Sequence, residues 1–192
     1  RSAGDALLQA VATRMRDLGC DCAARIGGDE FALLRLCGAS SDADELALQI
    51  MAAFAPAFDV AGHSIDVSAS VGIAMSANGA TSGNLLRHAD IAVSEAKERN
   101  RGGTVRFTPQ MAERIEVRRA LQMDLKNAIS KGELTLHYQP IVEAATWRIS
   151  SVEALLRWTS PRHGNVPPGV FIPIAEETGL MAELGRFVID QA

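Results

Sequence analysis

Residues 25–34 read Arg25-Ile26-Gly27-Gly28-Asp29-Glu30-Phe31-Ala32-Leu33-Leu34. The two glycines predict a tight turn between two strands, because glycine adopts positive φ angles without steric cost. Two carboxylates follow at the tip of the turn, where they can hold a hard cation such as Mg²⁺, and glycine lets a bulky ligand approach the backbone. On residue chemistry alone, a plain Gly-Gly hairpin with solvated acids is the simpler interpretation.

The segments around this turn show the periodicity of a mixed helix and strand domain. Asp42 and Glu45 have the spacing of a capping box and place the start of the second helix at Asp42. The apolar pattern predicts helices over 7–18, 42–54 and 84–99, and strands over 23–36 (two strands around the turn), 58–67 (a short hairpin), 67–75 and 104–107.

A charged helical segment over 111–129 contains neither proline nor glycine. Such a helix suits a stiff connection between two units, so we place a domain boundary here. We expect a first domain over 1–110, a linker helix over 111–131 and a second domain over 132–192. In the second domain the pattern predicts strands over 134–142 and 148–158, a loop with several prolines, and helices over 171–178 and 180–192.

Composition limits the possible functions. The 192 residues are 47% apolar and 22% charged with a net charge of −4, which excludes a wholly disordered chain. A mildly acidic chain has no general basic field, so we expect no nucleic-acid duplex as a partner. Three cysteines at irregular spacing argue against a disulfide framework and fit a reducing cytosol. No apolar run is long enough for a membrane span. We expect a cytoplasmic protein, and anchoring of a longer parent to the inner membrane through an upstream sensor is left open.

Four ordered motifs in the first domain resemble those of the GGDEF family, the diguanylate cyclases. They are the stretch over 25–34, Gly4-Asp5-Ala6-Leu7-Leu8, Ser70-Val71-Gly72-Ile73-Ala74, and a helix end that runs from Ala89-Asp90-Ile91-Ala92 through Ala96-Lys97 to Arg99-Asn100-Arg101. The resemblance implies a cyclase-like α/β sandwich with a central sheet and flanking helices. It also implies that two GTP molecules, one per domain in a dimer, condense to cyclic di-GMP.

The resemblance assigns roles to the residues of the turn. It implies that Asp29 and Glu30 bind Mg²⁺ or Mn²⁺, and that Glu30 also helps to activate the attacking 3′-hydroxyl. Gly27 and Gly28 would form the backbone platform for GTP, and Asp5 would contact guanine.

Two cations at the end of the third predicted helix resemble the pair that grips the terminal phosphates. Lys97 and Arg101 are four residues apart and therefore share one helix face. The same pair also suits an ordinary cationic helix end that faces the macrodipole, and both interpretations can hold at once.

Three departures from the GGDEF pattern stand out. By the resemblance, the chain begins after the first strand, which carries the family's other metal aspartate, and it also lacks the asparagine that helps to read guanine. We therefore expect that this fragment does not itself cyclise GTP. The family's product-inhibition motif, Arg-x-x-Asp, reads Leu18-Gly19-Cys20-Asp21 here. Because leucine cannot bind a phosphate or a guanine edge as a guanidinium does, we expect no feedback inhibition through this site.

The second domain carries a strand motif over 152–158, Val-Glu-Ala-Leu-Leu-Arg-Trp. Alternation puts Glu153, Leu155 and Arg157 on one face. From these residues alone, a weak ion pair within the strand is as good an interpretation as a site for a metal and a phosphate.

The motif over 152–158, together with the stretches over 136–142 and 166–180, resembles the EAL family, the cyclic di-GMP phosphodiesterases. The resemblance implies the first part of a TIM-like (β/α) barrel and metal-assisted attack of water on a phosphodiester, giving linear pGpG. Trp147 stands where the family's turn commonly carries glycine. By resemblance, Glu153 would be a metal ligand, and Gln139, Leu155 and Arg157 would contact cyclic di-GMP.

A complete barrel needs about 250 residues, so most of the EAL domain, including its later metal ligands and its catalytic lysine, is not in this chain. We expect no hydrolysis from the fragment alone. The sequence thus predicts an α/β cyclic di-GMP signalling protein with GTP and cyclic di-GMP as partners and a homodimer through the GGDEF domain, the EAL domain or both. A non-catalytic nucleotide-binding regulator or cyclic di-GMP receptor is the alternative. A purely structural interaction module is disfavoured, because so many polar residues match the family motifs at the expected positions.

Overall fold

The computed structural model describes residues 3–76, 80–99 and 102–192. The chain divides into two compact units, Arg1–Ala112 and Glu113–Ala192, which are described separately below. Both units combine helices with strands, so the predicted α/β class is confirmed. No helix in the described part of the chain is long and apolar enough to cross a lipid bilayer.

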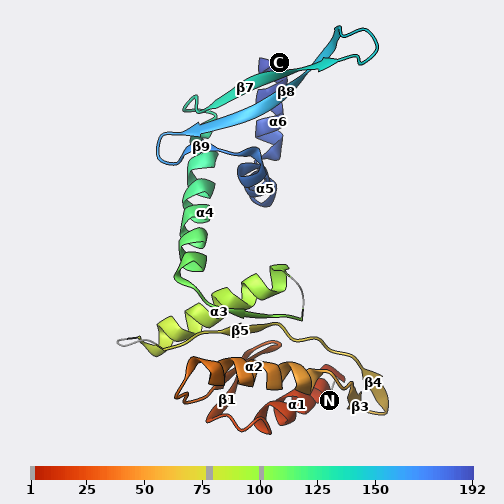
Figure 1. Cartoon of the computed structure of the whole chain (residues 1–192), viewed down its shortest axis with the longest axis vertical. Helices are drawn as coiled ribbons and strands as arrows, with labels where there is room; N and C mark the ends of the chain where they lie inside the picture. Colours follow the sequence, from red (N-terminus) through yellow and green to blue (C-terminus); the bar gives the residue numbers. More distant parts are fainter. Residues whose placement is uncertain (1–2, 77–79, 100–101) are drawn as a thin grey trace. The chain divides into compact units, whose positions relative to one another are not determined.

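The first unit alternates helices with short strands (Figure 1). Its described strands form three separate two-stranded ladders: β1–β2 and β3–β4 are antiparallel, and β5–β6 is parallel. We expected a single central sheet in this unit. The described strands do not form one, because no strand of one ladder pairs with a strand of another. The elements are α1 (Ala3–Arg16), β1 (Cys22–Gly27), β2 (Glu30–Leu34), α2 (Ser40–Phe54), β3 (Phe58–Val60), β4 (His63–Ile65), β5 (Val71–Ile73), α3 (Ser82–Arg99) and β6 (Thr104–Arg106).

The core of the first unit lies between α1, α2 and β3. Arg14 of α1 strengthens this packing, because its guanidinium donates hydrogen bonds of 2.6–2.9 Å to the carbonyl oxygens of Ala53, Pro56 and Ala57 at the end of α2. It also lies 3.6 Å from the centre of the Phe58 ring. A cation is favoured at this position because the last carbonyls of a helix carry partial negative charge. The buried residues of this core are Val11, Met15, Leu46, Ile50, Phe58 and Val60.

The start of α2 differs from the sequence prediction. The helix begins at Ser40, with Ala39 at the N-cap in an extended conformation. Asp42 is thus the third helical residue, and its Oδ2 accepts hydrogen bonds from the N–H groups of Ala39 and Gly38, both at 3.0 Å. The prediction that Asp42 itself starts the helix was therefore wrong. The Ala39 N–H, with that of Gly38, holds the pKa of the Asp42 carboxyl below its ordinary value.

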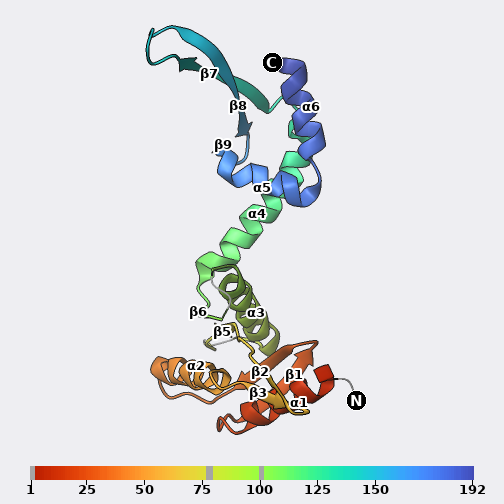
Figure 2. The same cartoon turned by 90° about the vertical axis from the view of Figure 1, so that its right-hand side faces the viewer.

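Gly72 lets β5 and α3 approach each other closely (Figures 1 and 2). A Cβ at this position would overlap the carbonyl oxygen of Ala89 and lie 2.5 Å from the backbone N of Val93. Only glycine fits such a contact between two backbones. The strand predicted over 67–75 is paired only over Val71–Ile73, and this glycine is its central residue.

The second unit holds most of α4 (Pro109–Ala128) and a three-stranded sheet in the order β7-β8-β9. Its core surrounds Trp158, whose Nε1 donates a 3.0 Å hydrogen bond to Glu133 and whose ring meets Phe171 edge-on. All pairs in this sheet are antiparallel, so the described strands of the second unit do not include the parallel pairs of a TIM-like barrel. The remaining elements are β7 (Leu134–Val142), β8 (Ile149–Ser160), β9 (Gly164–Val166), α5 (Pro168–Thr178) and α6 (Met181–Gln191).

Two details of the second unit differ from the expected elements. Helix α5 begins three residues earlier than predicted, at Pro168, and continues through Pro173. A proline suits the first helical position, because it has no N–H to leave unpaired there. The turn that joins β7 to β8 extends past α5 and α6 (Figures 1 and 2), and Trp147 in this turn is 85% exposed with φ +56°. Its backbone therefore has the left-handed conformation that favours glycine.

Candidate functional site

The β1–β2 turn presents an open backbone at its glycines. Gly27 ends β1 and pairs with Glu30 at the start of β2, after a register shift between Arg25 and Gly27. Gly28 has φ +42°, and a Cβ at either glycine would have no atom within 4 Å. The side of the turn on which these side chains would stand is therefore open to a ligand.

The structure brings the acidic turn next to the end of α3. The Nζ of Lys97 lies 3.7 Å from Oε1 of Glu30, and the two side chains are 51% and 54% exposed. An exposed pair of this kind contributes little to stability, about 0–1 kcal/mol, so it can be opened at small cost. Two residues far apart in sequence are thus neighbours, in a place that remains open to solvent. Arg101, the other predicted phosphate contact, lies outside the described residues.

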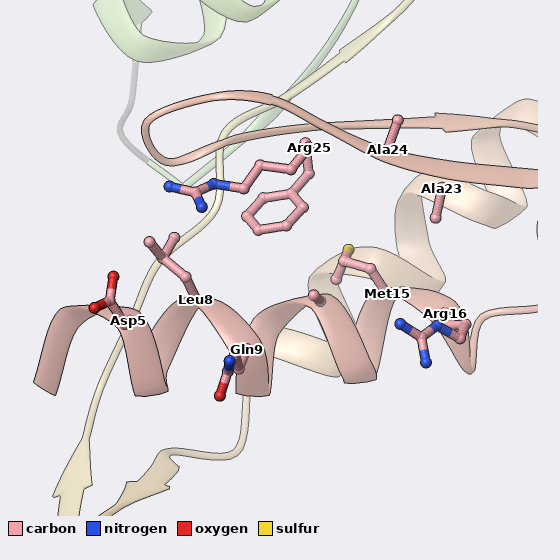
Figure 3. A pocket seen from close by; sticks show the side chains of 10 residues that line it. Asp5, Leu8, Gln9, Met15, Arg16, Ala23, Ala24 and Arg25 are labelled. Atoms are coloured by element: carbon pink, nitrogen blue, oxygen red, sulfur yellow. The ribbon is translucent and has the colours of Figure 1, made fainter. Parts of the chain in front are cut away.

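A pocket of about 410 Å³ lies between α1 and the β1–β2 hairpin (Figure 3). Asp5 and Leu8 lie at one end of the pocket and Arg16 at the other, and the Arg25 side chain extends toward the end with Asp5. Alanines at three lining positions leave room for a flat group, and the volume is in the range of small-molecule sites. The lining residues are Asp5, Leu8, Gln9, Ala12, Met15, Arg16, Ala23, Ala24, Arg25 and Phe31.

The donor atoms of the turn suit a divalent cation that arrives with phosphates. Among residues 3–76, 80–99 and 102–192, no group of three or more His, Cys, Asp or Glu side chains could share an ion. The turn offers the carboxylates of Asp29 and Glu30 alone. Mg²⁺ and Mn²⁺ prefer such oxygen donors, and Mg²⁺ commonly binds through one or two carboxylates with water and substrate phosphates completing its shell. The residues present therefore fit a nucleotide-bound cation better than a resident metal.

The window that replaces the product-inhibition motif is occupied by structural contacts. The Oδ2 of Asp21 accepts a 2.7 Å hydrogen bond from the N–H of Leu36, and the N–H of Asp21 donates to the carbonyl of Leu34 at 2.9 Å. Leu18 packs against the core of the first unit. Asp21 and Leu18 thus make structural contacts within the unit, and the absence of feedback inhibition through this window stays a prediction.

In the second unit, strand pairing collects the candidate residues on one face of β7 and β8. Gln139 pairs directly with Glu153, and Leu155 and Arg157 follow on the same face of β8. Glu153 and Gln139 are exposed, whereas Leu155 and Arg157 are half-buried. The opposite face of β8 carries the buried Trp158, which packs on α5.

Arg157 does not form the simple ion pair that its spacing from Glu153 allowed. Its Nη1 donates instead to the carbonyl oxygen of Leu156 at 3.0 Å. Gln139 lies opposite Glu153, and Glu153 belongs to no group of three or more His, Cys, Asp or Glu side chains in the described part of the chain that could hold a metal ion. A single carboxylate does not make a metal site, so we derive no metal-dependent step from this unit.

Two contacts in the structure have no signal in the sequence pattern. Arg25 donates from Nε and Nη2 to the carbonyl oxygen of Gly28, at 2.9 and 2.7 Å. In the second unit, Asp124 Oδ2 and His163 Nε2 are buried 3.3 Å apart and have no other polar partner among the described residues. The predicted turn brings Arg25 near Gly28, but neither turn prediction nor periodicity reveals where a long side chain bends.

Comparison with known proteins identifies both halves of the chain. Residues 1–103 match the diguanylate cyclase GGDEF domain, and residues 122–192 match the EAL domain. The chain belongs to the family of tandem GGDEF–EAL proteins. Domains of these two families generally depend on divalent metal ions.

Similar proteins include characterised bacterial enzymes. The bifunctional diguanylate cyclase/cyclic di-GMP phosphodiesterase MucR of Pseudomonas aeruginosa is 40% identical over 192 residues, which cover 98% of this chain and 28% of MucR. The cyclic di-GMP phosphodiesterase PdeR of Escherichia coli is 41% identical over 86% of this chain and 25% of PdeR. The GGDEF domain of YfiN (TpbB) from P. aeruginosa has a similar structure, with a TM-score of 0.56 and 31% identity over 60% of this chain and 70% of that domain. The chain spans about a quarter of the length of the two full-length relatives.

Proposed function

We propose that this chain is part of a protein that makes and breaks cyclic di-GMP. The first unit would bind GTP for condensation to cyclic di-GMP, and the second would contribute to hydrolysis of cyclic di-GMP to pGpG. The observation that carries the proposal is the contact between Glu30 and Lys97, which places a carboxylate and a phosphate-binding cation together at an open glycine turn.

The first unit offers a separate place for each part of GTP. The pocket between α1 and the hairpin would take the guanine base, with Asp5 at the end nearer the Arg25 guanidinium. The backbone of Gly27 and Gly28 would carry the phosphates on the side that lacks a Cβ, where no other atom lies within 4 Å of the Cβ positions. Lys97 would turn from Glu30 to the terminal phosphates, and by the family resemblance Arg101 would bind them as well. Amine cations are effective point charges for phosphate oxygens.

Release of Glu30 from Lys97 would free its carboxylate for the reaction. Asp29 and Glu30 would hold Mg²⁺ or Mn²⁺, which when bound neutralises the charge on the transferring phosphate. Glu30 would also accept the proton of the attacking 3′-hydroxyl at a carboxylate oxygen. The 3′-hydroxyl of one GTP would attack the α-phosphate of a second GTP, and pyrophosphate would leave as the α–β phosphoanhydride bond breaks. We therefore propose that two copies of the domain, each with one GTP, meet as a homodimer.

The second unit would supply part of the surface that binds cyclic di-GMP. Gln139, Glu153 and Leu155 lie together on the uncovered face of β7 and β8, and Arg157 follows on that face. The planar guanidinium of Arg157 suits a phosphate, since it donates two parallel hydrogen bonds. Glu153 would join further ligands from the longer protein to hold the metal. We propose a cytoplasmic location, which the three free cysteines support.

A non-catalytic receptor is the second candidate. By the family resemblance, the remaining metal ligands of both domains lie in the longer protein, and a departure from the family pattern at those positions would favour the receptor. Nucleotide binding needs fewer of these ligands than catalysis does.

An activity assay of the longer protein that carries this chain tests the proposal directly. The protein is incubated with Mg²⁺ or Mn²⁺ and either GTP or cyclic di-GMP, and products are separated by chromatography. Asp29→Ala should abolish synthesis alone, and Glu153→Ala should abolish breakdown alone. A loss of breakdown in Asp29→Ala, or of synthesis in Glu153→Ala, would contradict the assignments. Binding of GTP or cyclic di-GMP without turnover in the unmodified protein would favour the receptor.

A further inference from the structure

Arg25 makes an unusual contact within the β1–β2 turn. The residue lies near the end of β1, and its guanidinium bends forward to the tip of the same hairpin. Both Nε and Nη2 donate to one acceptor, the carbonyl oxygen of Gly28, at 2.9 and 2.7 Å. Hydrogen bonds from a charged donor are shorter and stronger than neutral ones, so this pair fixes the direction of that carbonyl.

The direction of the Gly28 carbonyl determines that of the next N–H. The peptide between Gly28 and Asp29 is planar, and it is trans like every peptide in the described residues. In a trans peptide the C=O and N–H bonds point in opposite directions. When the Gly28 oxygen faces Arg25, the N–H of Asp29 must point away from Arg25.

We propose that Arg25 is a positioning residue for phosphate binding, acting through the Gly28–Asp29 peptide. Gly28 has φ +42° and no side chain of its own, so without the Arg25 contact its following peptide could rotate. Rotation would exchange the Asp29 N–H donor for a carbonyl oxygen, which repels a phosphate. Arg25 prevents this exchange, and the turn keeps a backbone donor where an anion can use it.

The inference rests on the proposed function, since it concerns the phosphates of the same nucleotide. It adds a residue that supports the turn and does not itself need to touch the ligand. The fork of the guanidinium is the essential feature, because both donors converge on one oxygen. Lysine carries the same charge on a single flexible ammonium and cannot reproduce this geometry.

The first part of the test uses the complete 192-residue chain without nucleotide. The ¹⁵N–¹H signals of the unmodified chain are compared with those of Arg25→Lys, Arg25→Gln and a control, Arg87→Gln, which removes an exposed arginine of α3 outside the hairpin. We expect the Asp29 amide signal to shift and broaden in both Arg25 variants, because the Gly28–Asp29 peptide then samples two orientations. The control and the thermal midpoints of all four proteins should be unchanged. A sharp, unshifted Asp29 signal in Arg25→Gln would overturn the inference.

The second part compares GTP with guanosine, both titrated in the presence of Mg²⁺. We expect Arg25→Gln to weaken GTP binding by about tenfold, Arg25→Lys to lose nearly as much, and guanosine binding to change by less than about twofold. Full rescue of GTP binding by lysine would assign Arg25 a direct charge contact and overturn the positioning role. An equal loss for guanosine would overturn it in favour of a pocket role. If the unmodified chain binds no GTP, the proposed function fails with the phosphate role, while the amide signals still report whether Arg25 fixes the turn.

Discussion

In the first unit the candidate site residues come from α1, the β1–β2 turn and α3, whereas in the second unit they lie on two paired strands. Glu30 and Lys97 meet across tertiary packing, since Lys97 lies on α3, which packs closely on β5 at Gly72. Gln139 and Glu153 meet because strand register places them opposite each other. The first arrangement therefore depends on packing far from the site, and the second depends on local pairing.

This difference has a consequence for how each site tolerates change. A shift of α3 would move Lys97 away from the turn while leaving the turn and the pocket beside α1 unchanged. On β8 the candidate residues lie on one face and the core on the other, so changes to the candidate face leave the packing of Trp158 intact.

The largest effect is expected on the buried face of β8. Trp158 is fully buried against Phe171, so Trp158→Ala should lower the free energy of unfolding by about 3–5 kcal/mol through lost contacts and a residual cavity. Urea unfolding followed by circular dichroism measures the change. Glu153→Gln on the other face is the matched control and should stay within about 0.5 kcal/mol. Similar losses from both variants would show that the two faces are not independent.

A somewhat smaller loss of stability is expected from a change at Gly72 in the first unit. Unlike Trp158→Ala, this change should also weaken GTP binding. Gly72→Ala would push a methyl group into the backbone of α3, and should cost about 3 kcal/mol, the upper end for overpacking. GTP binding should weaken as well, because α3 carries Lys97. Gly83→Ala, in an open position of the same helix, should be neutral or slightly stabilising. Unchanged GTP affinity in a folded Gly72→Ala protein would contradict the claim that the packing of α3 on β5 positions Lys97 for GTP.

A gain in stability is expected at the turn between β7 and β8. Trp147 is exposed with φ +56°, a conformation that costs a non-glycine residue about 1–2 kcal/mol. Trp147→Gly should therefore stabilise the second unit, by up to about 1 kcal/mol once the greater freedom of glycine in the unfolded chain is included. Thermal unfolding measures the gain, and a loss of stability would mean that the indole makes a favourable contact in solution.

The smallest effect concerns pH and the start of α2. The folded-state pKa of Asp42 is lowered, chiefly by the hydrogen bond from the Ala39 N–H, so the carboxylate stabilises the fold above its unfolded-state pKa. That contribution is lost as the pH falls through the lowered folded-state pKa. The difference in stability between the unmodified chain and Asp42→Asn should thus shrink below about pH 4. A difference that stays constant from pH 7 to pH 2.5 would contradict this assignment.

The sequence predicted the order of helices and strands well, because apolar periodicity reports which face of each segment is buried. It placed the start of α2 wrongly, since Ser40, Ser41 and Asp42 are all capping residues and only the extended backbone of Ala39 decides between them. It also predicted one central sheet where the described strands form separate ladders.

The candidate site was predictable only in part. Motif resemblance pointed to Glu30 and Lys97 separately, and their 3.7 Å contact needs the tertiary packing of α3. The facing of Gln139 and Glu153 depends on strand register, which the pattern of each strand alone does not define. The contact from Arg25 to Gly28 depends on a side-chain conformation that no pattern reports.

The most direct test of the account is a titration of the complete chain with GTP and Mg²⁺, monitored through the ¹⁵N–¹H signal of each backbone amide. The account predicts that the largest shifts fall on the β1–β2 turn, on the α1 side of the pocket around Asp5 and Leu8, and on Lys97, with the β3–β4 hairpin unaffected. Shifts confined to the β3–β4 hairpin or to the second unit, or no shifts at millimolar GTP, would contradict it.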